Sequence, residues 1–106
     1  MARRNRPRSD RRERERELRK SVREREKLAA TAPGGAPTHP IVVRSASVIE
    51  GMARSTPCVQ CGSELTLGDH TAETYQGRSL RLVRLVCRVC HAPRALWFHL
   101  QPQLLS

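Results

Sequence analysis

Apolar and polar positions divide the chain into three segments. Residues 1–30 are almost entirely charged, and their few apolar side chains are Leu18, Val22, Leu28 and some alanines. Residues 31–40 (TAPGGAPTHP) contain three prolines and two glycines, which exclude a helix or a central strand and predict a linker. Residues 41–106 contain short runs of apolar and β-branched residues, as expected for the strands of a small domain.

The apolar runs of the third segment predict four strands. Residues 41–50, which start with Ile-Val-Val, predict a leading extended strand. A short strand is expected near 64–68, followed by a polar, exposed hairpin turn over 68–77. Residues 78–87 (RSLRLVRLVC) predict the longest strand, and 94–100 (RALWFHL) its returning partner. Because the longest strand is apolar on both faces, we expect segment 41–50, or a partner, to cover one of them.

The first segment predicts a solvent-exposed helix over about 9–30. It carries 13 Arg or Lys against 6 Asp or Glu, and Ser9 is a suitable N-cap. Helical spacing predicts three favourable charge pairs, which are Glu15–Arg19, Glu17–Lys20 and Glu24–Lys27. Three interpretations stay open: a solvated or disordered tail, a basic arm that docks on phosphates or on an acidic surface, or a dimerising helix with Leu18, Val22 and Ala29 on its seam.

Composition limits what the domain can be. A chain of 106 residues with 3% aromatic residues cannot build a large core, so a metal is the expected reinforcement. The net charge of +10 favours a polyanionic partner. The sequence contains no run of 18 apolar residues, so no membrane span is expected, and no signal peptide is visible. We therefore expect a cytoplasmic or nucleoid protein with reduced thiols.

Four cysteines carry the candidate chemistry, in the pairs Cys58–Cys61 and Cys87–Cys90. Each pair encloses two residues, and 25 residues separate the pairs. This spacing lets two tight turns meet around one tetrahedral ion, and four soft thiolates suit Zn²⁺. We predict one zinc ion per chain with these four ligands. A closed thiolate shell leaves no position for water, so neither catalysis nor a small-molecule substrate is expected.

The cysteines also allow interpretations besides zinc. Residues 87–91 form a CxxCH sequence, the attachment pattern of c-type haem, but haem would leave Cys58 and Cys61 unexplained. A rubredoxin-like iron site, two disulfides and redox-active dithiols stay open as well. With four cysteines available, His70, His91 and His99 are not needed as ligands, and His39 lies in the linker.

The sequences Pro57-Cys-Val-Gln-Cys-Gly62 and Cys87-Arg-Val-Cys90 resemble those of zinc ribbons, and the resemblance covers about residues 58–100. It implies a small metal-stabilised β domain of three or four short antiparallel strands. Gly62 fits the turn after the first pair, whereas His91 stands where a second glycine is easiest, which is a departure from the pattern. Zinc ribbons are similar in transcription factors, polymerase subunits and ribosomal proteins, so the resemblance does not identify a partner.

The combined sequence features predict a non-enzymatic binding protein that docks on nucleic acid, or on a ribosome or polymerase surface, through its basic arm. The candidate contact residues in the domain are Arg78, Arg81, Arg84, Arg88 and Arg94, with Trp97 available to stack on a base. The alternative is a protein-interaction adaptor with purely structural zinc, in which the N-terminal helix or the 41–50 strand binds a protein partner.

Overall fold

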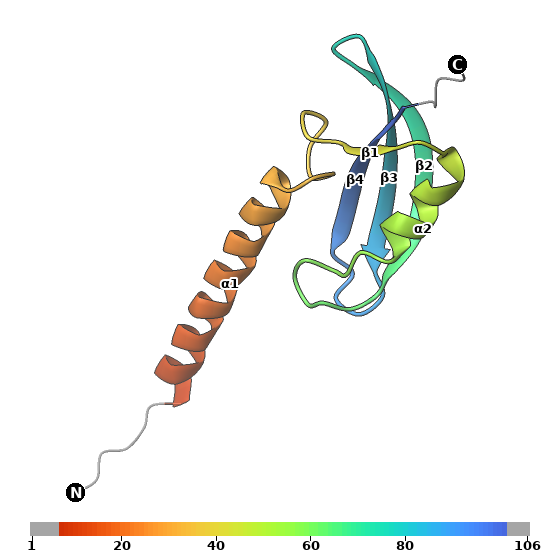
Figure 1. Cartoon of the computed structure of the whole chain (residues 1–106). Helices are drawn as coiled ribbons and strands as arrows, with labels where there is room; N and C mark the ends of the chain where they lie inside the picture. Colours follow the sequence, from red (N-terminus) through yellow and green to blue (C-terminus); the bar gives the residue numbers. More distant parts are fainter. Residues whose placement is uncertain (1–6, 102–106) are drawn as a thin grey trace, which may run out of the picture.

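A long helix projects from a small sheet domain (Figure 1). The structure is a computed structural model that describes residues 7–101; the ends of the predicted arm and domain, residues 1–6 and 102–106, lie outside the described residues. The radius of gyration is 18.9 Å, against about 13 Å for a compact protein of this length. The excess reflects the projecting helix. None of the described helices is long and apolar enough to cross a membrane.

Helix α1 spans Pro7–Thr31, which confirms the predicted N-terminal helix. Of its side chains from Ser9 onward, Asp10, Val22, Glu26 and Ala29 are partly covered and the others are exposed. The three predicted charge pairs are not formed: none of the ion pairs within 4.0 Å among the described residues joins two residues of α1. Exposed pairs on a helix contribute only about 0.2–0.5 kcal/mol each, so solvation of the separate charges competes with them.

The linker after α1 is folded against the sheet. The Gly34 amide donates to the His39 carbonyl at 2.6 Å, and the Trp97 amide donates to the Gly34 carbonyl at 2.9 Å. A Cβ on Gly35 would collide with the Ala29 carbonyl, so only glycine allows this close return of the chain. The end of α1 is therefore attached to the sheet through backbone hydrogen bonds.

The sheet has four strands in the order β1-β4-β3-β2. Strands β2 (Leu65–Tyr75), β3 (Arg78–Cys87) and β4 (Pro93–Leu100) are antiparallel neighbours. Strand β1 (Ile41–Val43) runs parallel to β4, so the prediction of an entirely antiparallel sheet is wrong. The hairpin of β2 and β3 separates β1 from β4 along the chain, and no tight turn imposes an antiparallel direction on them.

The predicted leading strand over 41–50 is also wrong beyond Val43. Residues Ala46–Val48 form a 3₁₀ turn, and α2 spans Ile49–Arg54. The Ser45 hydroxyl accepts from the Ser47 amide at 3.2 Å and caps this turn. Ile49 and Ala53, one helical turn apart, are fully buried. Burial of this apolar face outweighs the β propensity of Val48 and Ile49.

Strand β2 is longer than predicted, because the polar segment after Gly68 pairs with β3 instead of forming a loop. The hairpin turn consists of Gln76 and Gly77, with φ values of 50° and 78°. Two consecutive positive φ values are typical of the two-residue turn that matches the twist of the strands. A bulge lies between Leu67 and Asp69.

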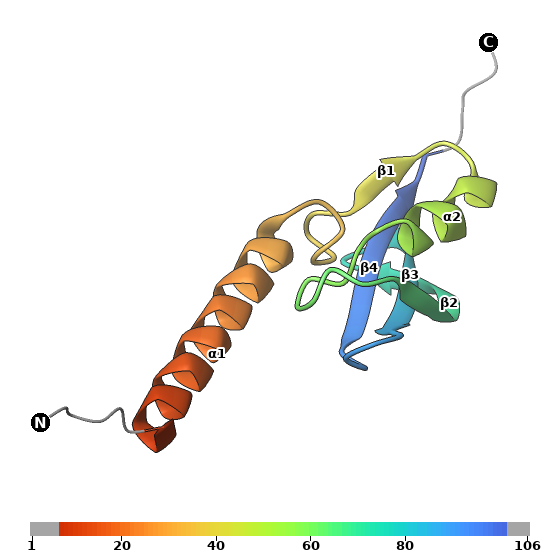
Figure 2. The ribbon, with the colours of Figure 1, turned by 90° about the horizontal axis from the view of Figure 1, so that it is seen from below.

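The core lies on one face of the sheet, beneath α2 (Figure 2). It includes Val83, Leu85, Leu96 and Phe98 of the sheet together with Ile49 of α2. Part of segment 41–50 thus covers one face of the longest strand, as expected, although it does so as a helix. On the opposite face, Leu80 and Leu82 are also buried, and half-buried Trp97 lies opposite Leu82 in the β3–β4 register.

Candidate metal centre

The four cysteines come from two loops at the same end of the β2–β3 hairpin. Cys58 and Cys61 lie in the loop between α2 and β2, and Cys87 and Cys90 lie where β3 ends. Because Leu65 pairs with Cys87, the start of β2 brings the two loops together. The four sulfur atoms lie within 4.8 Å of one another. The structure thus clusters all four predicted ligands, and the group contains no other residue.

The two cysteine loops share one backbone arrangement. In the first loop, the Cys58 amide donates to the Ser63 carbonyl and the Gly62 amide donates to the Cys58 carbonyl, both at 2.8 Å. In the second, the Cys87 amide donates to the Ala92 carbonyl at 3.0 Å and the His91 amide to the Cys87 carbonyl at 3.2 Å. Gly62 and His91, at equivalent positions, both have positive φ, 78° and 61°. Histidine therefore adopts the conformation that glycine adopts in the first loop.

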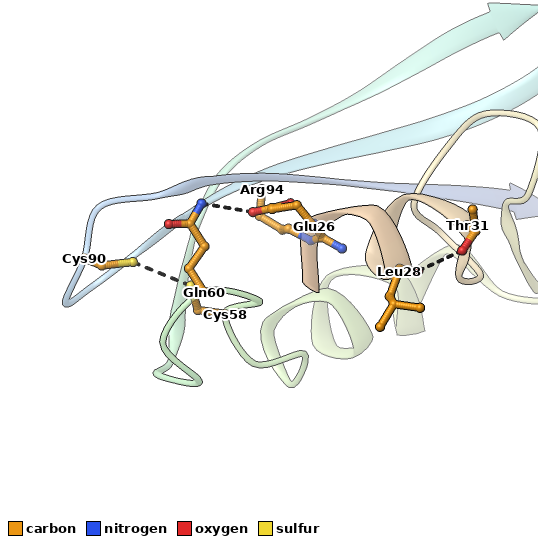
Figure 3. Close-up of polar contacts among 7 residues, drawn as sticks. All are labelled: Glu26, Leu28, Thr31, Cys58, Gln60, Cys90 and Arg94. Carbon is orange, nitrogen blue, oxygen red and sulfur yellow. Dashed lines mark hydrogen bonds and ion pairs between the residues drawn. The ribbon is translucent and has the colours of Figure 1, made fainter. Parts of the chain in front are cut away.

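Two of the sulfur–sulfur distances are close to those expected around a tetrahedral ion. The Sγ atoms of Cys58 and Cys90 are 3.6 Å apart (Figure 3), and those of Cys61 and Cys87 are 3.4 Å apart. Zinc–sulfur bonds of about 2.3 Å in a tetrahedron place the sulfurs ~3.8 Å apart. All four cysteines are free, and both separations far exceed the ~2.0 Å of a disulfide bond. Cys87 and Cys90 lie in one cluster with Cys58 and Cys61. The haem-attachment interpretation does not explain this clustering.

The pKa values of three of the thiols are shifted in different directions. Hydrogen bonds from the Ser63 hydroxyl and amide lower the pKa of Cys61 to about 6. The amide of Cys90 lowers the pKa of Cys87, against the effect of burial. For Cys90, the Ala92 amide favours the thiolate, but burial and the neighbouring sulfurs raise its pKa to about 12. Sulfurs this close cannot all be charged unless a cation lies among them, so the donor set fits a metal ion.

Helix α1 reaches the edge of this centre through Glu26 (Figure 3). One Glu26 oxygen accepts from the side-chain amide of Gln60, a residue between the first two cysteines, at 3.0 Å. Its other oxygen lies 3.3 Å from Arg94, whose side chain is only 14% exposed. Arg25 donates to the Gln60 carbonyl at 2.8 Å. The helix is therefore tied to the first cysteine loop and to β4.

The predicted contact residues of the domain do not form one surface. Arg81 and Arg94 lie on the face of the sheet that α2 covers, whereas Arg84 and Trp97 lie on the other face. Each of the five arginines has a polar partner: Arg78 with His99, Arg81 with His70, Arg84 with Asp69, Arg88 with Glu64 and Arg94 with Glu26. His70 also contacts Glu50 at 3.0 Å, which links β2 to α2.

Sequence reasoning missed Ser63, Gln60 and Glu26 at this site. Gln60 and Ser63 are close to the first cysteine pair, and that position was the available signal for them. Glu26 lies 68 positions from Arg94, and no pattern along the chain relates the two residues.

Comparison of the chain with protein-family models, with curated proteins and with solved structures gives no match.

Proposed function

We propose that Cys58, Cys61, Cys87 and Cys90 bind one structural Zn²⁺ ion per chain, and that the surrounding domain is a zinc ribbon. The sulfur-only donor set at tetrahedral spacing supports this proposal. The antiparallel β2–β3–β4 unit between and beyond the two loops also agrees with a ribbon. Four protein ligands leave no open position for substrate water, so the ion would stabilise the fold without catalysing a reaction.

Metal analysis tests the zinc assignment. Protein purified without added metal should contain one zinc per chain and be colourless. Each single Cys→Ser variant, such as C61S, should bind zinc less tightly than the parent protein. The matched control is S63A, which removes a hydroxyl beside the site and no ligand, and should keep the stoichiometry. Bound iron, or two disulfides in protein purified under reducing conditions, would contradict the assignment.

We further propose that the protein is a non-enzymatic binding protein that docks on nucleic acid, or on a nucleoprotein machine, through α1. The observation that carries this proposal is the placement of charge. Helix α1 has ten basic and six acidic residues, and most of it extends away from the sheet (Figure 1). In the domain, by contrast, the candidate arginines are occupied by internal partners. Most of the basic side chains without an ion-pair partner among the described residues are therefore on the arm, although Arg44 and Arg54 of the domain are exposed as well.

Salt-dependent binding tests the partner class. Full-length protein should bind labelled DNA or RNA, and its affinity should fall steeply between about 50 and 200 mM salt, because phosphate contacts release counterions. Affinity that stays constant over this range would contradict the proposal.

The alternative is a protein adaptor, and one observation favours it. Strand β1 is at the edge of the sheet, and Val42 on it is 56% exposed. An edge strand can accept a strand from another protein. At three residues, however, β1 offers few backbone groups. Capture of a protein partner that survives nuclease treatment would favour this alternative.

A further inference from the structure

The charges of α1 separate into stripes once they are placed on the helix. Successive residues are rotated by about 100° around the axis. Six basic residues fall within a sector of ~100°, and we call this set the basic stripe: Arg12, Arg16, Arg19, Lys20, Arg23 and Lys27. Four acidic residues fall within the adjacent ~60°, and we call them the acidic stripe: Asp10, Glu13, Glu17 and Glu24. The charges that alternate along the sequence are thus partly segregated in space, while the other two acidic residues, Glu15 and Glu26, lie along the opposite border of the basic stripe.

The basic stripe lies on a flank of α1, to one side of the face that meets the domain. The residues of α1 that are partly covered on the domain side, Val22, Glu26 and Ala29, centre on a direction about 100° from the middle of the stripe. All six members of the stripe are exposed. Among the described residues, none of them takes part in an ion pair within 4.0 Å. A partner can therefore approach the stripe without displacing α1 from the sheet.

We propose that the basic stripe binds the sugar-phosphate backbone of a nucleic-acid duplex, along one strand and without reading bases. This inference rests on the proposed function and specifies its residues and its ligand. From Arg12 to Lys27 the stripe is ~22 Å long at 1.5 Å per residue. Because each strand winds around the duplex axis, a straight helix of this length follows one strand over about three or four phosphates. The six cations are enough to pair with each of them.

The residue types also suit phosphate. Four of the six cations are arginines, whose planar guanidinium donates two hydrogen bonds to one phosphate group. The lysines lie at the border with the acidic stripe, and Arg19 lies at the opposite border near Glu15 and Glu26, so three arginines occupy the middle of the stripe. A straight row of cations complements the uniform charge of a nucleic-acid strand better than the irregular carboxylates of a protein surface.

The acidic stripe determines how the helix lies on the duplex. A helix with side chains is about 10–12 Å wide and would fill a major groove of about 12 Å. Both walls of that groove carry phosphates, so Glu13 and Glu17 would face one of them and be repelled. The helix therefore lies along one strand with its acidic stripe turned outward, and no side chain of the basic stripe reaches the base edges. Binding is independent of sequence.

Paired charge-removal variants test this placement. R12Q/R16Q removes two members of the stripe, and R11Q/R14Q removes the same charge from the same turns outside it. All four side chains are exposed, and glutamine has nearly the helix propensity of arginine. Binding of the full-length protein to two unrelated fluorescent DNA duplexes is measured by anisotropy over a salt series.

The parent protein should bind both duplexes alike, with a slope of log affinity against log salt of about −3 to −4 for three or four phosphate contacts. R12Q/R16Q should reduce the slope by about 2, whereas R11Q/R14Q should leave it near the parent value. Equal reductions of the slope in the two variants would contradict the basic stripe as the binding site but not nucleic-acid binding itself. A tenfold preference for one duplex would overturn backbone binding. No binding to either duplex at about 50 mM salt would overturn both this inference and the proposed function.

Discussion

At the residue scale, His91 is the position where the two cysteine loops differ chemically while sharing a conformation. Its φ of 61° lies in the left-handed region, which costs an L-residue about 1–2 kcal/mol and costs glycine almost nothing. Gly62 has φ 78°, and a Cβ there would meet nothing within 4 Å. We predict that H91G stabilises the metal-loaded protein by about 0.5 kcal/mol and that G62A destabilises it by ~1 kcal/mol. Denaturant unfolding measures both changes.

Gly51 provides the control for this pair of variants. A Cβ at Gly51 also meets nothing within 4 Å, but Gly51 lies inside helix α2. G51A should therefore stabilise the protein by up to ~1 kcal/mol, since alanine is the better helix former. If G62A behaved like G51A, positive φ would not be what the first loop requires.

The cysteine cluster could be predicted at this scale because metal geometry imposes a spacing that is visible along the chain. The two CxxC pairs were sufficient to select Cys58, Cys61, Cys87 and Cys90, and the structure brings these four together. The contacts between α1 and the region around the cysteines were not predictable in the same way. Glu26 holds Arg94 across a contact that depends on where α1 lies, and the sequence contains no repeat or spacing for such a contact.

At the element scale, Glu26 contributes two side-chain contacts between α1 and the domain. It is the residue of α1 that accepts from Gln60 and pairs with Arg94. We predict that E26A leaves the sheet folded and the metal bound but lets α1 move relative to the domain, because both of these side-chain contacts are lost. Backbone ¹⁵N relaxation measures this directly: residues near the C-terminal end of α1 should tumble with the sheet in the parent protein and more independently in E26A.

E24A is the matched control for that experiment. Glu24 lies in the same turn of α1, is exposed, and has no ion pair within 4.0 Å among the described residues. Its removal should leave the relaxation of α1 unchanged. Equal mobility in the two variants would mean that the backbone hydrogen bonds of the linker, rather than Glu26, hold the helix.

The elements were predicted where local pattern decides them and missed where packing decides them. Strands β3 and β4 coincide with long apolar runs in the sequence, and these runs predict them directly. The segment after Val43 resembles a strand by propensity, but Ile49 and Ala53 bury one helical face against the sheet. Their i, i+4 spacing and the capping residue Ser45 were the available signals. The polar half of β2 has no apolar alternation of its own, and its pairing with β3 determines its conformation.

At the scale of the whole molecule, the domain should depend on the bound ion. Structural zinc contributes roughly 10–16 kcal/mol in small domains, which exceeds the total stability expected for one this size. We predict that removal of the metal by a strong chelator unfolds the sheet. Trp97, the chain's one tryptophan, is half-buried and reports the change. Its emission should shift to the red on chelation and return when zinc is restored.

Helical circular dichroism separates that unfolding from a general loss of structure. Helix α1 holds 25 of the residues and lies mostly outside the sheet, so part of the helical signal should persist after chelation. A chelated protein that keeps the parent tryptophan emission, with metal loss verified by elemental analysis, would show that the sheet folds without the ion.

The most direct measurement is X-ray absorption at the zinc edge of the protein as purified. The account predicts one zinc per chain with four sulfur neighbours at about 2.3 Å and no nitrogen or oxygen bound to the ion. A mixed set of ligands, fewer than four sulfurs, or a different metal in the site would contradict it.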